Sequence, residues 1–268
     1  MIKKLCSLAT LTLIGLVAWI GIDLLIRGAG GWSADYLWSA PSDLGRSGGI
    51  GPMLASTFLI VLLATGLAAL VSMPAAVLYT ELDSPRWYRR AVSATMDIGI
   101  GVPRIVWGLF GGVVFGGVLG LGFSVASGVL TLACLLSPIL VTGFISGLQA
   151  VDPALREQCA ALGVSRWRAF WRQILPAARP ALIAATALGV GRGCGDAAAL
   201  LFTAGVVSEL PQSLLDPAAT LAVFVFHLLT TIPGGQTAAY TAAGVLFLIT
   251  LAIQVGIAGA DQQEGLAR

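Results

Sequence analysis

Residues 155–180 read LREQCAALGVSRWRAFWRQILPAARP, and this basic, aromatic-rich segment lies between two long apolar blocks. Directly before it, Asp152 and Pro153 pair an N-cap residue with a proline at the first helical position, which predicts a helix start. Gly163 is placed to end that helix, because glycine readily adopts the left-handed conformation common at helix C-termini. The segment therefore opens with a short, capped helix.

The short helix is predicted to have two distinct faces. Leu155, Cys159 and Leu162 fall on one face, with Arg156 and Glu157 turned away from it. Two roles are open for Glu157: it pairs with a basic residue of a partner protein, or it is a solvated surface charge.

A second helix is predicted to start near Ser165. Its apolar residues recur at i, i+3, i+4 and i+7, an amphipathic stripe made of Trp167, Phe170, Trp171 and Ile174. With arginines on the remaining surface, this stripe also suits a helix lying in a membrane interface. Pro176 and Pro180 are expected to break or redirect the chain before the next apolar block.

Outside this segment the chain consists mostly of apolar blocks of about twenty or more residues, the length that crosses a bilayer core. Hydrophobic residues make up 57% of the 268 residues and charged residues 10%, whereas a soluble domain carries roughly 25% charged residues. We therefore predict an all-α integral membrane protein, since open strands leave backbone groups unsatisfied in lipid. Six transmembrane helices are predicted, at residues 5–26, 53–79, 94–119, 123–148, 180–204 and 237–257.

The first apolar block follows Lys3 and Lys4, as the core of a signal peptide would. It is long and is not followed by an A-x-A cleavage site, so a retained helix is the preferred interpretation. One charged segment, residues 80–90, follows the second block. Its members, which include Glu81, are interpreted as solvated surface or partner contacts.

Lysine and arginine are distributed unequally between the two sides of the predicted spans. One side carries Lys3, Lys4, Arg86, Arg89, Arg90, Arg156, Arg166, Arg168, Arg172, Arg179 and Arg268, and the other carries Arg27 and Arg46. Because cytoplasmic loops hold the excess of basic residues, both termini and residues 149–179 are predicted to be cytoplasmic. The net charge of +2 is too small to indicate nucleic-acid binding.

Glycines recur regularly along the third predicted span. Gly108, Gly112, Gly116 and Gly120 recur at every fourth position, and this stripe would let another helix approach closely.

The sequence contains no G-x-x-x-x-G-K-[ST] loop, so any ATP used must bind another chain. A single histidine and scattered acids offer no hydrolytic or metal-binding motif, which argues against an intramembrane enzyme.

Residues 155–180 resemble the cytoplasmic EAA loop of ABC importer permeases of the MetI-like, binding-protein-dependent family. Its fixed points are occupied by Glu157, Gly163, Leu175 and Pro176. Gln158 and Cys159 replace its two alanines. The resemblance implies a type I ABC importer permease fold in which the loop at about 149–179 forms a coupling helix docked on an ATPase. It assigns ATPase coupling to Arg156, Glu157, Leu162 and Gly163.

Three further stretches resemble phosphate-transport permeases of the PstA type. They are GVPRIVWGLFGG at 101–112, GVGRGCGDAAALLFTAG at 189–205 and LLDPAATLAVFVFHL at 214–228. The chain departs from that pattern at Asp196, where the family usually has Glu, and at Arg104, where it typically has a small residue. Ala197 and Ala199 also replace Thr and Pro.

The resemblance covers roughly residues 50–257 and implies a permease subunit that moves inorganic phosphate, powered by a separate ATPase. It implies as partners a homologous permease, a cytoplasmic ATPase dimer, a periplasmic substrate-binding protein and the lipid bilayer, with no cofactor, metal or nucleic acid. The expected division is 1–51 for the first helix and periplasmic loop, 52–258 for the permease domain and 259–268 for a cytoplasmic tail. Molybdate, tungstate or phosphonate as cargo, or a secondary transporter or channel, are the alternatives.

Two arginines fall inside predicted spans, where a charge costs about 2.5–3.5 kcal/mol. Arg192 is expected one turn before Asp196 on the same helix face, so the two either form a mutual ion pair or line a path where Arg192 meets an oxyanion. Arg104 follows Pro103, which can kink the helix. It either shapes an anion site, pairs with Asp97, or extends toward the interface. Arg192, Asp196 and Arg104 are the predicted substrate-path residues.

Overall fold

The structure is a computed structural model that describes residues 2–82 and 84–266. Arg268, which contributes to the predicted charge asymmetry, lies outside the described residues. The helices are α1 Ile2–Arg27, α2 Gly51–Thr80, α3 Arg86–Gly101, α4 Arg104–Gly111, α5 Val125–Gln149, α6 Pro153–Ala161, α7 Arg166–Ala169, α8 Leu175–Cys194, α9 Leu221–Thr230 and α10 Gln236–Leu266. Two-residue strands β1 Pro41–Ser42 and β2 Ser47–Gly48 pair antiparallel.

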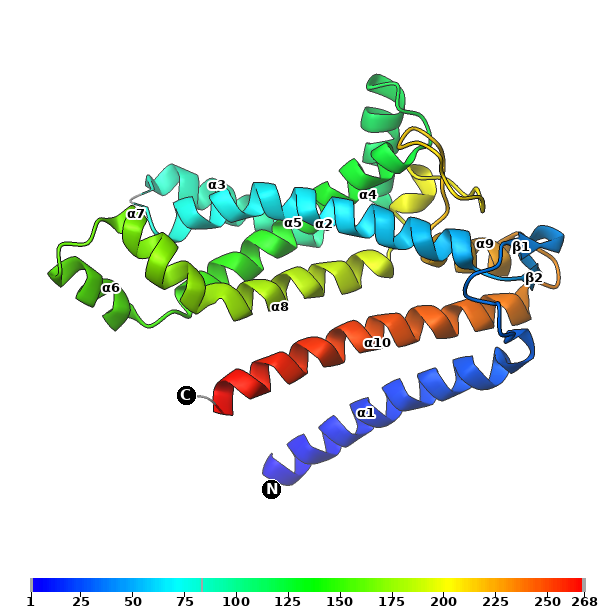
Figure 1. Ribbon diagram of the computed structural model, residues 1–268, viewed down its shortest axis with the longest axis horizontal. Coiled ribbons are helices and arrows are strands. Elements are labelled where there is room, and N and C mark those ends of the chain that lie inside the picture. Colours follow the sequence, from blue (N-terminus) through cyan, green and yellow to red (C-terminus); the bar gives the residue numbers. More distant parts are fainter. Residues whose placement is uncertain (1, 83, 267–268) are drawn as a thin grey trace.

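The long helices lie side by side, with α2, α5 and α8 at the centre and α10 and α1 along one flank (Figure 1). Ile60, Ala64, Leu132, Leu136 and Leu140 are fully buried where α2 packs against α5. The termini lie toward the end that carries α6 and α7, whereas β1, β2 and α9 lie at the opposite end (Figure 1). The predicted all-helical membrane fold is confirmed in these described residues.

Five helices among the described residues are long and apolar enough to cross a membrane. The predicted third span is the exception, because it is two helices, α3 and α4, bent by 102°. Val102 and Pro103 are both extended, since proline disfavours helix in the preceding residue and lacks a backbone N–H. The Trp107 indole N–H donates across the break to the Gly99 carbonyl at 3.4 Å. Counting the bent pair as one span gives the predicted six.

The glycine stripe allows a close approach, but not of another membrane-spanning helix. A Cβ on Gly108 would lie 2.9 Å from the Ala198 carbonyl oxygen, and one on Gly112 would lie 2.8 Å from the Phe202 carbonyl oxygen. The partner is therefore the backbone after α8, which forms a turn and then a short 3₁₀ helix at Leu200–Phe202. A π-helix at Gly112–Val118 follows α4, and Gly120 lies beyond it with φ +70°. Gly120 thus belongs to the tight turn rather than to the stripe.

The predicted fifth span is displaced toward the N-terminus. Helix is continuous over Arg166–Cys194, so Pro176 and Pro180 do not break it. A π-helical turn at Phe170–Ile174 widens the backbone just before Pro176, which relieves the clash that proline makes inside an α-helix. The helix ends at Cys194 instead of continuing to residue 204.

Two later segments also differ from expectation. The stretch between the last two predicted spans contains α9, an apolar helix of 10 residues that is too short to span a bilayer. It begins with the Thr220 hydroxyl accepting from the Val223 N–H at 3.4 Å. α10 continues through most of the predicted tail, as far as Leu266.

Candidate functional site

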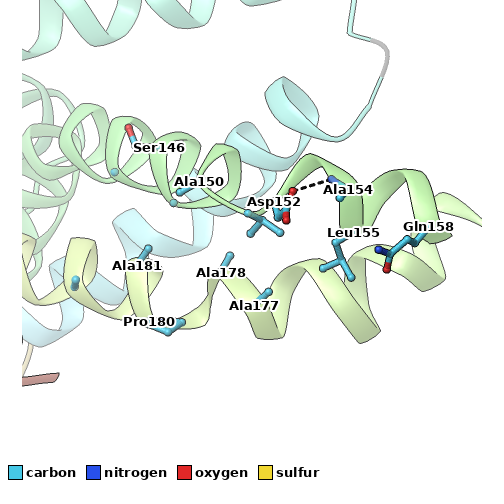
Figure 2. Close-up of a pocket in the computed structure, with 14 residues that line it drawn as sticks. Ser146, Ala150, Asp152, Ala154, Leu155, Gln158, Ala177, Ala178, Pro180 and Ala181 are labelled. Atoms are coloured by element: carbon cyan, nitrogen blue, oxygen red, sulfur yellow. Dashed lines mark hydrogen bonds between the residues drawn. The ribbon is translucent and has the colours of Figure 1, made fainter. Parts of the chain in front are cut away.

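The first candidate site is α6 together with the turn into α7, which we call the coupling segment, residues 152–166. The predicted start is confirmed, since Asp152 Oδ1 accepts from the Ala154 N–H at 2.9 Å (Figure 2). Pro153 occupies the first helical position. The predicted end is confirmed as well, since Gly163 has φ +67°. The Gly163 and Val164 N–H groups donate to the Ala160 and Cys159 carbonyls at 3.0 Å each, which is a Schellman cap.

The exposed face of α6 differs from the predicted one. Leu162 is 81% exposed, whereas Cys159 is buried and Leu155 is half-buried. Glu157 and Gln158 are exposed. Leu162 and Glu157 are therefore both accessible on the coupling segment.

Arg156 does not turn away from the protein, so that part of the prediction is wrong. Its Nη2 donates to Glu81 Oε1 at 2.8 Å. Glu81 is correspondingly buried, with 9% of its side chain exposed, rather than a solvated surface charge. Sequence reasoning missed this partner, because nothing local indicates that a residue after α2 meets one in α6.

The amphipathic stripe of the second helix is split. Phe170 and Ile174 are buried, but Trp167 and Trp171 are 61% and 52% exposed. The three aromatic rings contact one another, with centroid distances of 5.4 to 6.0 Å. The exposed rings thus form a small apolar surface next to the coupling segment.

A cavity of about 830 Å³ separates the start of α6 from α8 (Figure 2). Small residues line it from α5 and α8, including Gly143, Gly147, Ala178 and Ala181. Ser146 and Ala150 line it from the end of α5, with Asp152 and Leu155 at its outer end (Figure 2). On this side α6 is therefore not packed tightly against the membrane helices.

The second candidate site is the charge pair Arg104–Asp196, which joins α4 to the backbone after α8. Nη1 of Arg104 lies 3.3 Å from Asp196 Oδ2, a contact between charges without hydrogen-bond geometry. Asp196 Oδ1 accepts from the Ala199 N–H at 3.0 Å. The Asp196 side chain is 0% exposed and that of Arg104 is 43% exposed. The carboxylate is thus enclosed while part of the guanidinium is accessible.

This geometry excludes two of the pairings that the sequence left open. Asp196 lies beyond the end of α8 and pairs with Arg104, not with Arg192 on the same helix. Arg104 likewise pairs with Asp196 instead of Asp97. Arg192 is exposed on α8 and makes no salt bridge with the residues whose side chains are described, 3–82 and 84–256. Two of the three predicted path residues therefore come together, and the third does not join them.

The family model described as binding-protein-dependent transport system inner membrane component matches residues 68–259. Two probable ABC transporter permease proteins of Bacillus subtilis are each 28% identical to the chain. The match to YqgH covers 69% of this chain and 62% of that protein, and the match to YqgI covers 89% and 85%. The chain thus spans less than two thirds of YqgH but most of YqgI.

Phosphate transport system permease proteins are also similar. PstA of Yersinia pestis is 30% identical over 94% of this chain and 85% of that protein. Among solved structures, the MetNI methionine ABC transporter in inward-facing conformations matches with a TM-score of 0.60 at 15% identity, over 77% of this chain and 93% of that chain. At this identity the likeness shows a shared fold.

Proposed function

The chain belongs to the family of binding-protein-dependent transport system inner membrane components, and from this premise we propose that it imports phosphate as one permease subunit of an ABC importer. The predicted membership of the MetI-like ABC importer permeases is thereby confirmed. Its relatives are named permease proteins, not enzymes, which agrees with a transport subunit whose ATP is hydrolysed by a partner.

Arg104 is the observation that carries the anion proposal. A guanidinium offers five N–H donors in a fork that matches an oxyanion, and the Arg104 side chain remains 43% exposed beside Asp196. A half-exposed arginine on an otherwise apolar helix is too costly to face lipid. We therefore assign its accessible face to a water-filled path, where an anion can bind the exposed donors.

Phosphate is favoured over other oxyanions by similarity to the phosphate permeases and by a chemical argument. A buried carboxylate beside the arginine can accept a hydrogen bond from a protonated phosphate, whereas sulfate has no proton to offer at neutral pH. Molybdate, tungstate and phosphonate remain the rival cargoes.

Competition of uptake tests the cargo. In cells expressing this chain with its partner subunits, uptake of radiolabelled phosphate should be inhibited by arsenate and not by sulfate or molybdate. Inhibition by molybdate at equal concentration would instead identify the rival cargo.

Arg192 is proposed to line the same path, because it is exposed on α8 and forms no ion pair with a residue in 3–82 or 84–256. Arg192→Ala should abolish phosphate uptake while the chain still assembles and retains its ATPase. The matched control is Arg179→Ala, an exposed arginine at the other end of α8, which should transport normally. Wild-type uptake by the Arg192 variant would make this residue structural.

For the coupling segment we propose docking on the ATPase through exposed Leu162 and Glu157, with Gly163 setting the turn. Gly163→Pro should reduce uptake about tenfold, because proline requires φ near −65° and removes the N–H that donates to Ala160. Gly163→Asn is the control, since asparagine tolerates the left-handed conformation. Comparable uptake by the proline and asparagine variants would contradict the assignment.

We place the complex in the bacterial inner membrane, with residues 52–258 as the permease domain. The proposed partners are a homologous permease, two ATPase subunits and a periplasmic substrate-binding protein. Both termini are placed in the cytoplasm by the excess of basic residues at that end. In this arrangement ATP-driven movement of the coupling segment reorients the path between the two sides of the membrane.

A further inference from the structure

The guanidinium of Arg156 joins three elements at one point. Nη2 and Nε donate to the two Glu81 carboxylate oxygens at 2.8 and 3.3 Å, a bidentate arrangement that fixes orientation as well as distance. Nη1 donates to the Val151 carbonyl at 2.9 Å, and Nη2 also donates to the Leu148 carbonyl at 2.8 Å. Glu81 directly follows α2, Leu148 lies in the last turn of α5, and Arg156 belongs to α6.

A positive charge is needed where α2 and α5 end. α2 and α5 both end here, and each helix C-terminus carries a partial negative charge. A glutamate at such an end is unfavourable unless a positive charge compensates it. The side chains of Glu81 and Arg156 are only 9% and 29% exposed, so water screens the pair less than it screens a surface ion pair.

The side of α6 that faces α8 is not packed tightly against the membrane helices. The cavity of about 830 Å³ lies between the start of α6 and α8 (Figure 2). Cys159 is the buried residue of α6, and Leu155 is half-buried against the core. The hydrogen bonds of Arg156 add a direct polar link from α6 to the ends of α2 and α5.

From this arrangement we propose that Arg156 is a positioning residue that ties α6 to the ends of α2 and α5, so that displacement of α6 moves both membrane helices. The inference rests on the proposed function, and it replaces the role of an ATPase contact that the sequence predicts for Arg156. Glu81 becomes a member of the transmission path. A rigid link is needed because a loosely attached helix would absorb the movement of the ATPase rather than pass it on.

The test compares Arg156→Gln, Glu81→Gln and the double variant with Arg90→Gln, an exposed arginine on α3. Hydrogen exchange of the purified chain should show α6 amides exchanging about tenfold faster in Arg156→Gln, with α8 amides unchanged. In vesicles containing the whole complex, Arg156→Gln should keep its bound ATPase but lose about tenfold in phosphate imported per ATP hydrolysed. Glu81→Gln should show a smaller loss in the same direction.

The double variant separates a linked pair from two independent residues. Removing Glu81's charge also removes the uncompensated buried carboxylate that Arg156→Gln leaves behind, so the double variant should be no worse than Arg156→Gln alone. Losses that multiply, or unchanged exchange of α6, would overturn the inference. So would loss of the bound ATPase in Arg156→Gln while Glu81→Gln behaves as wild type. Absence of any ATPase from the wild-type complex would instead refute the proposed function. The hydrogen-exchange result would still stand in that case, because it is measured on the purified chain and does not depend on the ATPase.

Discussion

Arg104→Gln is expected to reduce phosphate uptake about 100-fold, equivalent to about 2.7 kcal/mol of lost transition-state stabilisation. Glutamine is shorter than arginine and has no charge for an anion to bind. It also leaves the Asp196 carboxylate, which is 0% exposed, without its counter-charge. Initial rates of radiolabelled phosphate uptake, normalised to the amount of chain in the membrane, measure the effect.

A double variant distinguishes anion binding from a purely structural ion pair. If the pair only stabilises the fold, Arg104→Gln combined with Asp196→Asn should recover transport, because no buried charge is left uncompensated. If Arg104 binds the anion, the double variant should remain inactive at normal membrane levels. Arg46→Gln is the control, since Arg46 forms an exposed pair with Asp43 at 3.0 Å and such pairs contribute about 0–1 kcal/mol. Recovery in the double variant would contradict the anion assignment.

Gly108→Val is expected to prevent the chain from accumulating in the membrane, or to lower its melting temperature by several degrees. The new Cβ would lie 2.9 Å from both the Ala198 carbonyl oxygen and the Ala199 Cα. These are backbone atoms beside the charge pair, so they cannot yield as a flexible side chain would. Overpacking of this kind typically costs about 1–3 kcal/mol. Quantitative membrane blots and thermal unfolding in detergent measure the change.

Gly101→Val is the matched control for this prediction. It introduces the same side chain just before the break between α3 and α4, where a Cβ would meet nothing within 4 Å. The control should accumulate and unfold as the wild type does. Equal stability of the two variants would mean that the backbone after α8 is not packed against α4 as closely as the structure has it.

Features that depend on neighbouring residues were predictable. Asp152 and Gly163 correctly mark the start and the end of α6, because caps act on backbone groups within four positions along the chain. The apolar blocks likewise locate the long helices, since the bilayer sets their length. The break at Pro103 was anticipated as a kink, but its size of 102° was not, because the angle depends on what α3 and α4 pack against.

The sequence did not identify which charged residues pair with each other. The sequence places Arg192 and Asp196 one turn apart, which indicates a pair only while both are helical. Helix α8 ends at Cys194, and the apolar run that follows folds back on Gly108 and Gly112. No periodicity marks that end, because the residues after it are as apolar as those before.

The sequence by itself determined a polytopic helical membrane protein, the capped helix α6 and the family, all of which follow from composition, local capping and short motifs. Only the tertiary structure decided that Arg104 meets Asp196 and that Arg156 meets Glu81. Each of these pairs joins residues far apart in the chain. Their meeting depends on how whole helices pack, and a pattern along one segment carries no information about which other segment will supply the opposite charge.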